Sequence, residues 1–384
     1  MNISKKNTHR VTCLFLLTVF IVLLFTPCKV KALKKNNPQS KNITGKNINV
    51  SARCAVALDS KSKVVLYEKN AYELVPMAST TKIMTALVAL KYGDLDRKIE
   101  ISSKAASIKG STVGFKKGEK ISIKELVYGL MLRSGNDAAI AIAEGISGSV
   151  EEFAKLMNEC AGEIGVVNTH FETPHGLDKD EHYSTAYDLA VVTSKAKTNE
   201  LFNEIVKSKD VDGNALGFTR SYHNINKILW QMPEANGVKT GYTGKAGKCL
   251  VSSANIQGND VIVVVLNCTE RWKESIKIFE YVNKNYQFKK MFSKGDAAGE
   301  IALKKGNVNL LYDEDVIIPV KSGVEYTVKV IKPEKVNHTV NKGDKIGKIC
   351  VYAEGTLVYS NDLEAANTIK VKEYPKWIKK IIKS

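Results

Sequence analysis

The sequence predicts an α+β domain followed by a small all-β domain, and three observations carry this prediction. Strand-like runs stand near both ends of the first region, over residues 54–70 and 247–268, and helical periodicity dominates the stretch between them. After about residue 288 the helical signals disappear, and short alternating apolar runs are separated by glycine and lysine. Strands, then helices, then strands are typical of α+β folds in which the terminal strands share one sheet.

The individual elements follow from local patterns. Residues 54–70 are predicted to form a hairpin around the turn residues 59–62, and residues 247–268 to form two strands joined at 258–260. A helix is predicted to begin near Ser79 as its N-cap, because Pro76 ends the preceding strand and apolar residues then recur at helical spacing. Further helices are predicted over 123–145 with a break at 134–136, over 150–165, from about 185, and over 275–285.

Both ends of the chain carry targeting signals. Residues 1–32 are predicted to be a secretory signal, because basic residues precede an uncharged apolar run over 11–25 and small residues stand at Val30 and Ala32. An uncleaved anchor is the alternative, but the run is shorter than the roughly 20 apolar residues that a spanning helix needs. Residues 33–49 are predicted to be a tether.

Residues 373–384 are predicted to form a short basic amphipathic tail. On a helical wheel one face carries Trp377, Ile378, Ile381 and Ile382, and lysines take the other face. This arrangement favours weak attachment to a membrane surface. The alternative is that Trp377 docks on the β-domain.

The charge of the chain bears on the kind of partner that it can bind. The net charge is +17, of which the predicted signal contributes five basic residues. The remaining lysines are scattered rather than clustered with aromatic residues, so no nucleic-acid partner is expected. A basic surface on an exported protein favours binding to an anionic wall polymer or lipid.

No metal or other cofactor is expected from the residue spacings. The six histidines form no H-E-x-x-H motif, and we expect His175 to fix a loop rather than to bind metal. After the signal, five widely spaced cysteines remain without a C-x-x-C motif, and we expect buried thiols rather than a disulfide framework or zinc site. They are Cys54, Cys160, Cys249, Cys268 and Cys350.

The first chemical motif is Ser79-Thr80-Thr81-Lys82. A serine and a lysine three residues apart lie on one helix face, within reach of each other. A neutral amine can take the proton of a serine hydroxyl, and burial beside a second cation favours the neutral form. The N–H groups at the helix start suit an oxyanion. A capping serine with a surface lysine is the alternative, but the apolar residues directly after Lys82 favour a buried site.

Two further stretches fit the same chemistry. Ser134 and Asn136 flank a glycine between two predicted helices, although Ser-Gly-Asn is also ordinary turn chemistry. Lys239-Thr240-Gly241 stands just ahead of the second strand pair, where the alternative is a lysine-rich hairpin turn. Lysine supplies positive charge there, threonine a hydroxyl, and glycine lets a substrate backbone approach a strand edge.

Together these motifs resemble those of penicillin-recognising serine enzymes, and more closely the low-molecular-weight penicillin-binding proteins that are serine-type D-Ala-D-Ala carboxypeptidases. The stretches NTHFETPHGL, HYSTAYDLA and GVKTGYTGKAG extend the resemblance over about residues 50–285, and it continues more loosely beyond. It implies a penicillin-binding/β-lactamase-like catalytic domain over 50–287, an antiparallel sheet with helices. An all-β sandwich domain over 288–372 would follow.

The resemblance also implies residue roles. Ser79 would be the acylated nucleophile and Lys82 its base, while Ser134 would pass a proton to the leaving amine and Asn136 would donate to the substrate amide. Lys239 and Thr240, with Gly241 beside them, would bind the terminal carboxylate of the substrate. The backbone N–H groups of Ser79 and Tyr242 would bind the oxyanion.

The implied function is trimming of peptidoglycan stem peptides that end in D-Ala-D-Ala, by an exported enzyme at the outer face of the cytoplasmic membrane or in the cell wall, with β-lactam antibiotics as acylating ligands. One alternative is a class A-like β-lactamase, but Gly135 stands where that family carries Asp, and Glu172 lacks the E-x-x-L-N setting. The other alternative is a non-catalytic penicillin-binding wall protein, against which the intact Ser79, Lys82 and Lys239 argue.

Overall fold

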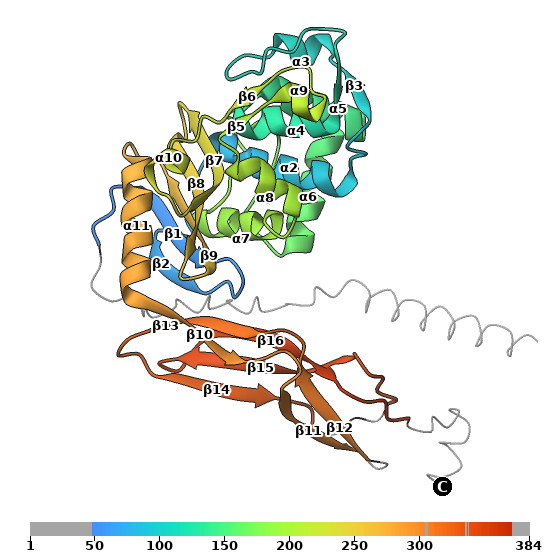
Figure 1. The fold of residues 1–384 in the computed structure, drawn as a ribbon, viewed down its shortest axis with the longest axis vertical. Helices are drawn as coiled ribbons and strands as arrows, with labels where there is room; N and C mark the ends of the chain where they lie inside the picture. The colour runs from blue at the N-terminus through green and yellow to red at the C-terminus, as the bar shows by residue number, and fades with distance from the viewer. Residues whose placement is uncertain (1–47, 304–305, 335, 337, 371–384) are drawn as a thin grey trace, which may run out of the picture. The chain divides into compact units, whose positions relative to one another are not determined.

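The computed structural model describes residues 48–303, 306–334, 336 and 338–370. Its central feature is a five-stranded antiparallel sheet in the order β2-β1-β9-β8-β7 (Figure 1). The strands are β1 (Cys54–Asp59), β2 (Val65–Lys69), β7 (Ala235–Thr243), β8 (Gly247–Ile256) and β9 (Asn259–Leu266). The predicted hairpin and strand pair are therefore present, and strands from both ends of this region share one sheet as predicted.

Helices cover both faces of the sheet because alternate strand residues point to opposite sides. Val56 and Val264 belong to one apolar cluster with residues of α7, and Ala57 and Val263 belong to a second cluster with residues of α11. The longer helices are α2 (Lys82–Tyr92), α4 (Ile123–Leu132), α5 (Asn136–Ser147), α6 (Val150–Ile164), α7 (Ala186–Ala196), α8 (Glu200–Lys207) and α11 (Arg271–Asn285). The shorter elements of this region are the 3-10 turn η1 (Ala78–Thr81), α3 (Ser103–Ser107), α9 (Gly213–Leu216), α10 (Ile228–Gln231), β3 (Lys98–Glu100), β4 (Lys120–Ser122), β5 (Asp210–Val211) and β6 (Tyr222–His223).

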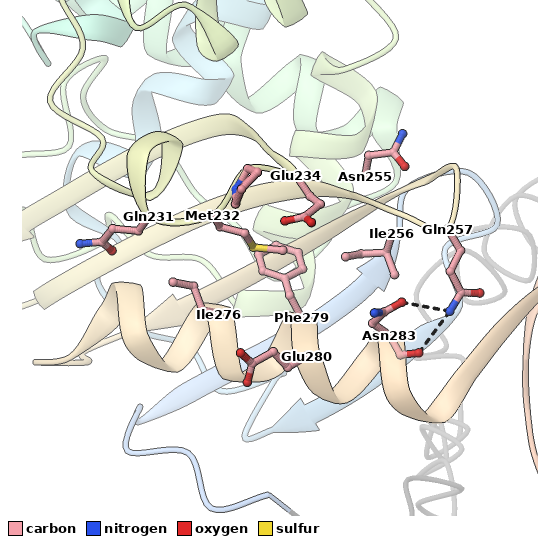
Figure 2. Close-up of a pocket in the computed structure, with 11 residues that line it drawn as sticks. Gln231, Met232, Glu234, Asn255, Ile256, Gln257, Ile276, Phe279, Glu280 and Asn283 are labelled. Carbon is pink, nitrogen blue, oxygen red and sulfur yellow. Dashed lines mark hydrogen bonds between the residues drawn. The ribbon is translucent and has the colours of Figure 1, made fainter.

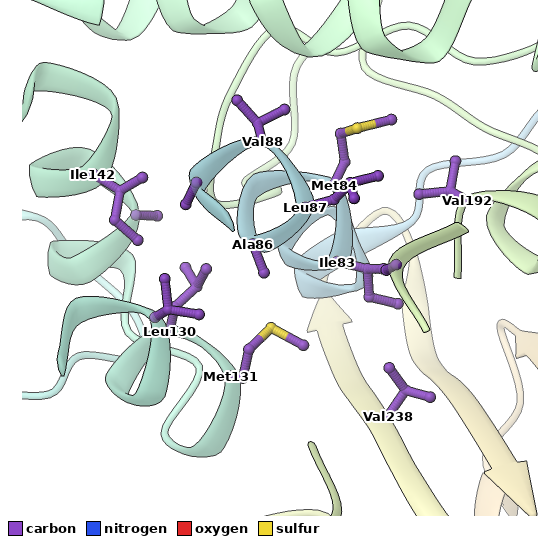
Figure 3. Close-up of a cluster of buried hydrophobic side chains, with 14 of the residues drawn as sticks. Ile83, Met84, Ala86, Leu87, Val88, Leu130, Met131, Ile142, Val192 and Val238 are labelled. Carbon is purple, nitrogen blue, oxygen red and sulfur yellow. The ribbon is translucent and has the colours of Figure 1, made fainter. Parts of the chain in front are cut away.

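Helix α2 runs through the apolar core and is buried over its first eight residues. Figure 3 shows its side chains surrounded by residues of α4, α5, α7 and β7. A helix that is apolar on all sides is stable only when neighbours cover all sides. The first residue of this helix, Lys82, is therefore held inside the domain. The labelled partners in this cluster are Leu130, Met131, Ile142, Val192 and Val238.

The predicted N-cap at Ser79 is wrong. Ser79 lies inside the 3-10 turn η1, and the α-helix begins only at Lys82. The hydroxyl of Thr80 donates to the Met77 carbonyl at 2.6 Å and that of Thr81 to the Ala78 carbonyl at 2.8 Å, so both satisfy the preceding turn locally. Ser79 does not cap the helix, so its hydroxyl is available to other partners.

Helix α11 also starts earlier than predicted, at Arg271 rather than at residue 275. Its first residues are Arg271-Trp272-Lys273-Glu274, which carry little apolar periodicity. By contrast, the break between α4 and α5 and the predicted helices α6 and α7 lie where the sequence predicts them.

From residue 286 on, all secondary-structure elements in the described part of the chain are strands, as predicted. Strands β10 (Tyr286–Phe292) and β13 (Val316–Lys321) form an antiparallel pair. A five-stranded sheet follows in the order β11-β12-β16-β15-β14. Its members are β11 (Ala297–Leu303), β12 (Gly306–Tyr312), β14 (Tyr326–Ile331), β15 (Lys345–Ala353) and β16 (Thr356–Ala365).

The five cysteines after the predicted signal are free and buried, which confirms their prediction as apolar core thiols. The predicted signal peptide and the predicted tail lie outside the described residues, as does nearly all of the tether, so these three remain predictions together with the domain boundaries. No helix within the described ranges has the length and hydropathy that a membrane span requires.

Candidate active site

Three groups, two of them distant in sequence, meet at the amine of Lys82. Lys82 Nζ lies 2.9 Å from Ser79 Oγ, 2.7 Å from Asn136 Oδ1 and 2.7 Å from the carbonyl oxygen of His175. The amide oxygen and the carbonyl can only accept hydrogen bonds, whereas the serine hydroxyl can also donate. A neutral amine, with two N–H groups and one lone pair, therefore satisfies all three contacts when Ser79 O–H donates to nitrogen.

The surroundings of Lys82 favour that neutral amine. Its side chain is fully buried, and loss of hydration is the main reason that its pKa lies well below the ordinary lysine value. The positive charge of Lys239 lowers the pKa further, while the carboxylate of Asp137 opposes the shift. Lys82 is thus buried beside a second cation, an arrangement that favours the neutral amine.

Asn136 is held in one orientation by a neighbouring loop. Its Nδ2 donates to the carbonyl of Lys109 at 2.8 Å, so its Oδ1 faces Lys82. Ser134 is buried at the same corner between α4 and α5, with a positive φ of 59°. In the described part of the chain, its side chain makes no hydrogen bond with Ser79 or Lys82. The structure therefore brings Asn136 into contact with Lys82 and leaves Ser134 beside this group.

The third motif lies on the edge strand β7, directly against the turn that carries Ser79. A Cβ atom added at Gly241 would lie 3.1 Å from Ser79 N and 3.2 Å from Thr80 N. Glycine therefore permits the close approach of β7 to η1. Tyr242 follows Gly241 and is 67% exposed.

Lys239 is a second buried lysine in this group. Its Nζ donates to the carbonyl of Thr240 at 2.9 Å. Burial, followed by the charge of Arg271, lowers the pKa of Lys239 to about 7. Arg271 itself donates to the Gly241 carbonyl at 2.6 Å, which ties α11 to the strand that carries the motif.

Sequence reasoning missed the part that the segment 173–178 plays. The His175 carbonyl accepts from Lys82, and the Asp178 carboxylate accepts from Thr243 Oγ1 at 2.7 Å, at the end of β7. No residue type marks a backbone acceptor in advance, although the HGL stretch was part of the resemblance. As expected, His175 fixes its own loop, because its Nδ1 accepts from Leu177 N at 3.1 Å.

His182 supports the 3-10 turn η1 through a contact with Thr81. Its Nδ1 accepts from Glu172 N at 3.0 Å, so Nε2 carries the proton and donates to Thr81 Oγ1 at 2.8 Å. Burial lowers the pKa of His182 to about 4 and that of His175 to about 3, so both rings are neutral at physiological pH. Among the described residues, no group of three or more His, Cys, Asp or Glu side chains could hold a metal ion.

Glu172, the residue considered for the β-lactamase alternative, hydrogen-bonds to its own loop. Its carboxylate accepts from Glu181 N at 2.9 Å.

A concavity lies between α10, the β8–β9 turn and α11 (Figure 2). Gln257 donates there to the carbonyl and to the side chain of Asn283. None of the predicted site residues lines this concavity.

Comparisons with known proteins show which family this chain resembles. The family model described as D-alanyl-D-alanine carboxypeptidase matches residues 39–270, and that of the C-terminal domain of penicillin-binding protein 5 matches residues 286–371. D-alanyl-D-alanine carboxypeptidase DacF of Bacillus subtilis is 31% identical over 86% of this chain and 88% of its own length. DacA of Escherichia coli K12 is 31% identical over 82% of each chain.

Solved structures agree with these relatives. Penicillin-binding protein 5 from Haemophilus influenzae superimposes with a TM-score of 0.73 and 29% identity, over 85% of this chain and 99% of that one. The fold and the grouping of serine, lysine and asparagine thus define a penicillin-binding protein of low molecular weight. The chain belongs to the D-alanyl-D-alanine carboxypeptidase family, whose model matches more than half of it.

Proposed function

We propose that the protein removes the terminal D-alanine from peptidoglycan stem peptides that end in D-Ala-D-Ala, through an acyl-enzyme on Ser79. The observation that carries the proposal is the contact of 2.9 Å between Ser79 Oγ and the buried amine of Lys82. The other two partners of this amine are acceptors only, so a neutral amine can donate both its N–H groups to them and keep its lone pair for the serine proton.

The reaction follows from that contact. Ser79 Oγ attacks the carbonyl carbon of the penultimate D-Ala while Lys82 takes the hydroxyl proton. The C–N bond then breaks, and the proton reaches the leaving amine through Ser134. Water hydrolyses the resulting ester and restores Ser79. The attack on a β-lactam amide is the same, with ring opening in place of departure of D-alanine.

Binding of the oxyanion and of the terminal carboxylate is proposed for β7 and η1. The approach of Gly241 to Ser79 N brings the backbone of Tyr242 close to the turn, so the N–H groups of Ser79 and Tyr242 can converge on one oxygen. Lys239 keeps N–H groups beyond its bond to the Thr240 carbonyl, and with the Thr240 hydroxyl it suits a carboxylate.

The direct test measures D-alanine release from a synthetic peptide ending in D-Ala-D-Ala, with the L-Ala-L-Ala peptide as control. Release from the first peptide alone supports the proposal. If penicillin labels Ser79 but no D-alanine is released, the protein is a non-catalytic penicillin-binding protein. Hydrolysis of the penicillin ester at rates typical of efficient enzymes would instead support the β-lactamase alternative.

Gly176→Ala should slow acylation by fluorescent penicillin at least about 10-fold, because a strained loop displaces the active-site turn. Gly176 has a φ of +84°, and a Cβ atom there would lie 2.0 Å from the Ala78 carbonyl oxygen. Both that turn and the neighbouring His175 carbonyl contact the reacting groups. The labelling rate and the thermal midpoint are measured together.

Gly165→Ala is the matched control for this variant. Gly165 has a φ of +85°, but nothing lies within 4 Å of an added Cβ atom. It should lose stability of about 1 kcal/mol from the left-handed backbone alone and keep its labelling rate. Equal labelling rates in both variants would contradict the role given to the 173–178 segment.

We also propose that the exported enzyme attaches weakly to the outer face of the cytoplasmic membrane through residues 373–384. The support is the sequence pattern of one apolar and one lysine-rich face. Mature protein should float with anionic vesicles at low salt and be released as salt rises, because each lysine near such a surface contributes about 1 kcal/mol. A chain ending at Tyr374 should remain in the soluble fraction, and equal flotation of both chains would exclude the tail as the anchor.

A further inference from the structure

The loop between α3 and β4 is fastened to the corner that holds the second motif. Asn136 N donates to the Ser111 carbonyl at 2.8 Å, and Asn136 Nδ2 donates to the Lys109 carbonyl at 2.8 Å. The buried carboxylate of Asp137 accepts three more backbone N–H groups from this loop. Their donors are Val113 at 3.0 Å, Gly114 at 2.8 Å and Phe115 at 3.1 Å.

This loop is short of acidic partners. Three of its lysines are exposed, and so is Arg133, which directly precedes Ser134. None of these four side chains forms an ion pair with another described residue. The nearby Glu119 is already paired with Arg220 at 2.7 Å. We call the four residues the cationic rim, and they are Lys109, Lys116, Lys117 and Arg133.

We propose that the cationic rim binds carboxylates of the substrate peptide that lie outside its terminal D-Ala-D-Ala. The proposal rests on the proposed function and adds that the same site prefers substrates with negative charge. Its basis is position: the Lys109 carbonyl, Asn136, Lys82 and Ser79 are linked by three consecutive hydrogen bonds. Lys109 itself belongs to this series, Arg133 directly precedes Ser134, and Lys116 follows Phe115, whose N–H donates to Asp137. The rim side chains therefore start from the backbone that surrounds Asn136.

The terminal carboxylate has a different site, so the rim is free for other acids. Lys239 is 1% exposed and lies on β7 beside η1, whereas the rim lies at the α4–α5 corner. The rim is solvated, so each of its contacts should be weak and sensitive to salt. Such a surface raises the rate of productive encounter with an anionic substrate more than it raises the maximal rate.

A polyanionic wall polymer that carries phosphate would also be attracted by exposed lysines. The fastening of the rim loop to Asn136 and Asp137 favours the substrate, because it keeps the charges at the reacting groups rather than on a remote surface. The same observation argues against lysines that are merely solvated.

The test uses the mature enzyme with two synthetic peptides that end in D-Ala-D-Ala. One carries free side carboxylates and the other carries the same groups as amides. The variant is Lys116→Gln with Lys117→Gln, whose side chains lie outside the catalytic group. The control is Lys284→Gln with Lys289→Gln, which makes the same change in charge. Lys284 lies near the end of α11 opposite to Arg271, about 20 Å along the helix axis.

The rim variant should lose roughly 2- to 10-fold in kcat/KM for the carboxylate peptide at low salt, a range that corresponds to two exposed charge contacts. It should keep kcat/KM for the amidated peptide, and the difference should vanish at high salt. The control variant should match the wild type with both peptides. Equal losses with both peptides, or no loss with either, would overturn the proposal.

Two further outcomes are distinguishable. If the wild type releases no D-alanine from either peptide, the proposed function is wrong, and the assignment of the rim to this substrate falls with it. If the rim variant keeps the wild-type preference between peptides but binds less to isolated cell walls bearing phosphate polymers, the partner is such a polymer, and the substrate proposal is refuted.

Discussion

Ser79→Ala should abolish both D-alanine release and labelling by penicillin, and the protein should remain folded. The expected loss is about 10⁴-fold or more, because without the hydroxyl no acyl-enzyme forms and only binding and oxyanion stabilisation remain. The structural cost is small. The hydroxyl makes one good contact, with Lys82 Nζ, and a long one of 3.5 Å to the His175 carbonyl.

Intact-mass spectrometry after incubation with penicillin measures the adduct, and released D-alanine is assayed on the same preparation. Ser107→Ala is a suitable control, since Ser107 is exposed at the end of α3 and its hydroxyl makes a long contact of 3.5 Å with the Lys104 carbonyl. This control should acylate at the wild-type rate. D-alanine release by purified Ser79→Ala at the wild-type rate would refute the mechanism as a whole.

The contact between Ser79 and Lys82 could be predicted from sequence because it depends only on spacing and on the apolar residues that follow. Spacing three residues apart gives neighbouring side chains in a 3-10 turn as well as in an α-helix. For this reason the error about the N-cap did not affect the prediction of the pair. It arose because the hydroxyls of Thr80 and Thr81 bond to the preceding carbonyls and favour the tighter turn.

The remaining partners depend on the tertiary fold. The His175 carbonyl lies 93 residues from Lys82 in sequence, and any residue type could supply it. The close packing of Gly241 against Ser79 N requires both the register of β7 on β8 and the position of η1. The sequence does predict that strands from both ends of the region share a sheet, because strands, then helices, then strands are typical of an α+β fold.

Lys82→Arg should block acylation, whereas Lys239→Arg should retain part of it. A guanidinium stays protonated in proteins, so arginine at position 82 can neither take the serine proton nor present a lone pair to it. At position 239 the required group is a cation facing a carboxylate, which arginine also provides, so the change should mainly raise KM. The two variants preserve formal charge and therefore separate a base from an anion-binding group.

The wild type should show a bell-shaped dependence of kcat/KM on pH. Activity rises as Lys82 loses its proton, and its pKa is lowered by burial and by Lys239. It falls as free enzyme loses the charge on Lys239, whose pKa burial lowers to about 7. Lys239→Arg should remove this falling limb, because arginine keeps its charge at every pH used.

The measurements are penicillin acylation rates and D-alanine release from pH 5 to 10, with thermal midpoints to show that each variant is folded. In Lys82→Arg, acylation should be lost at every pH, because the defect is the absence of a base rather than a shifted pKa. Normal acylation by a folded Lys82→Arg protein would show that another group takes the proton. The contact of 2.9 Å between Lys82 and Ser79 would then orient the nucleophile without activating it.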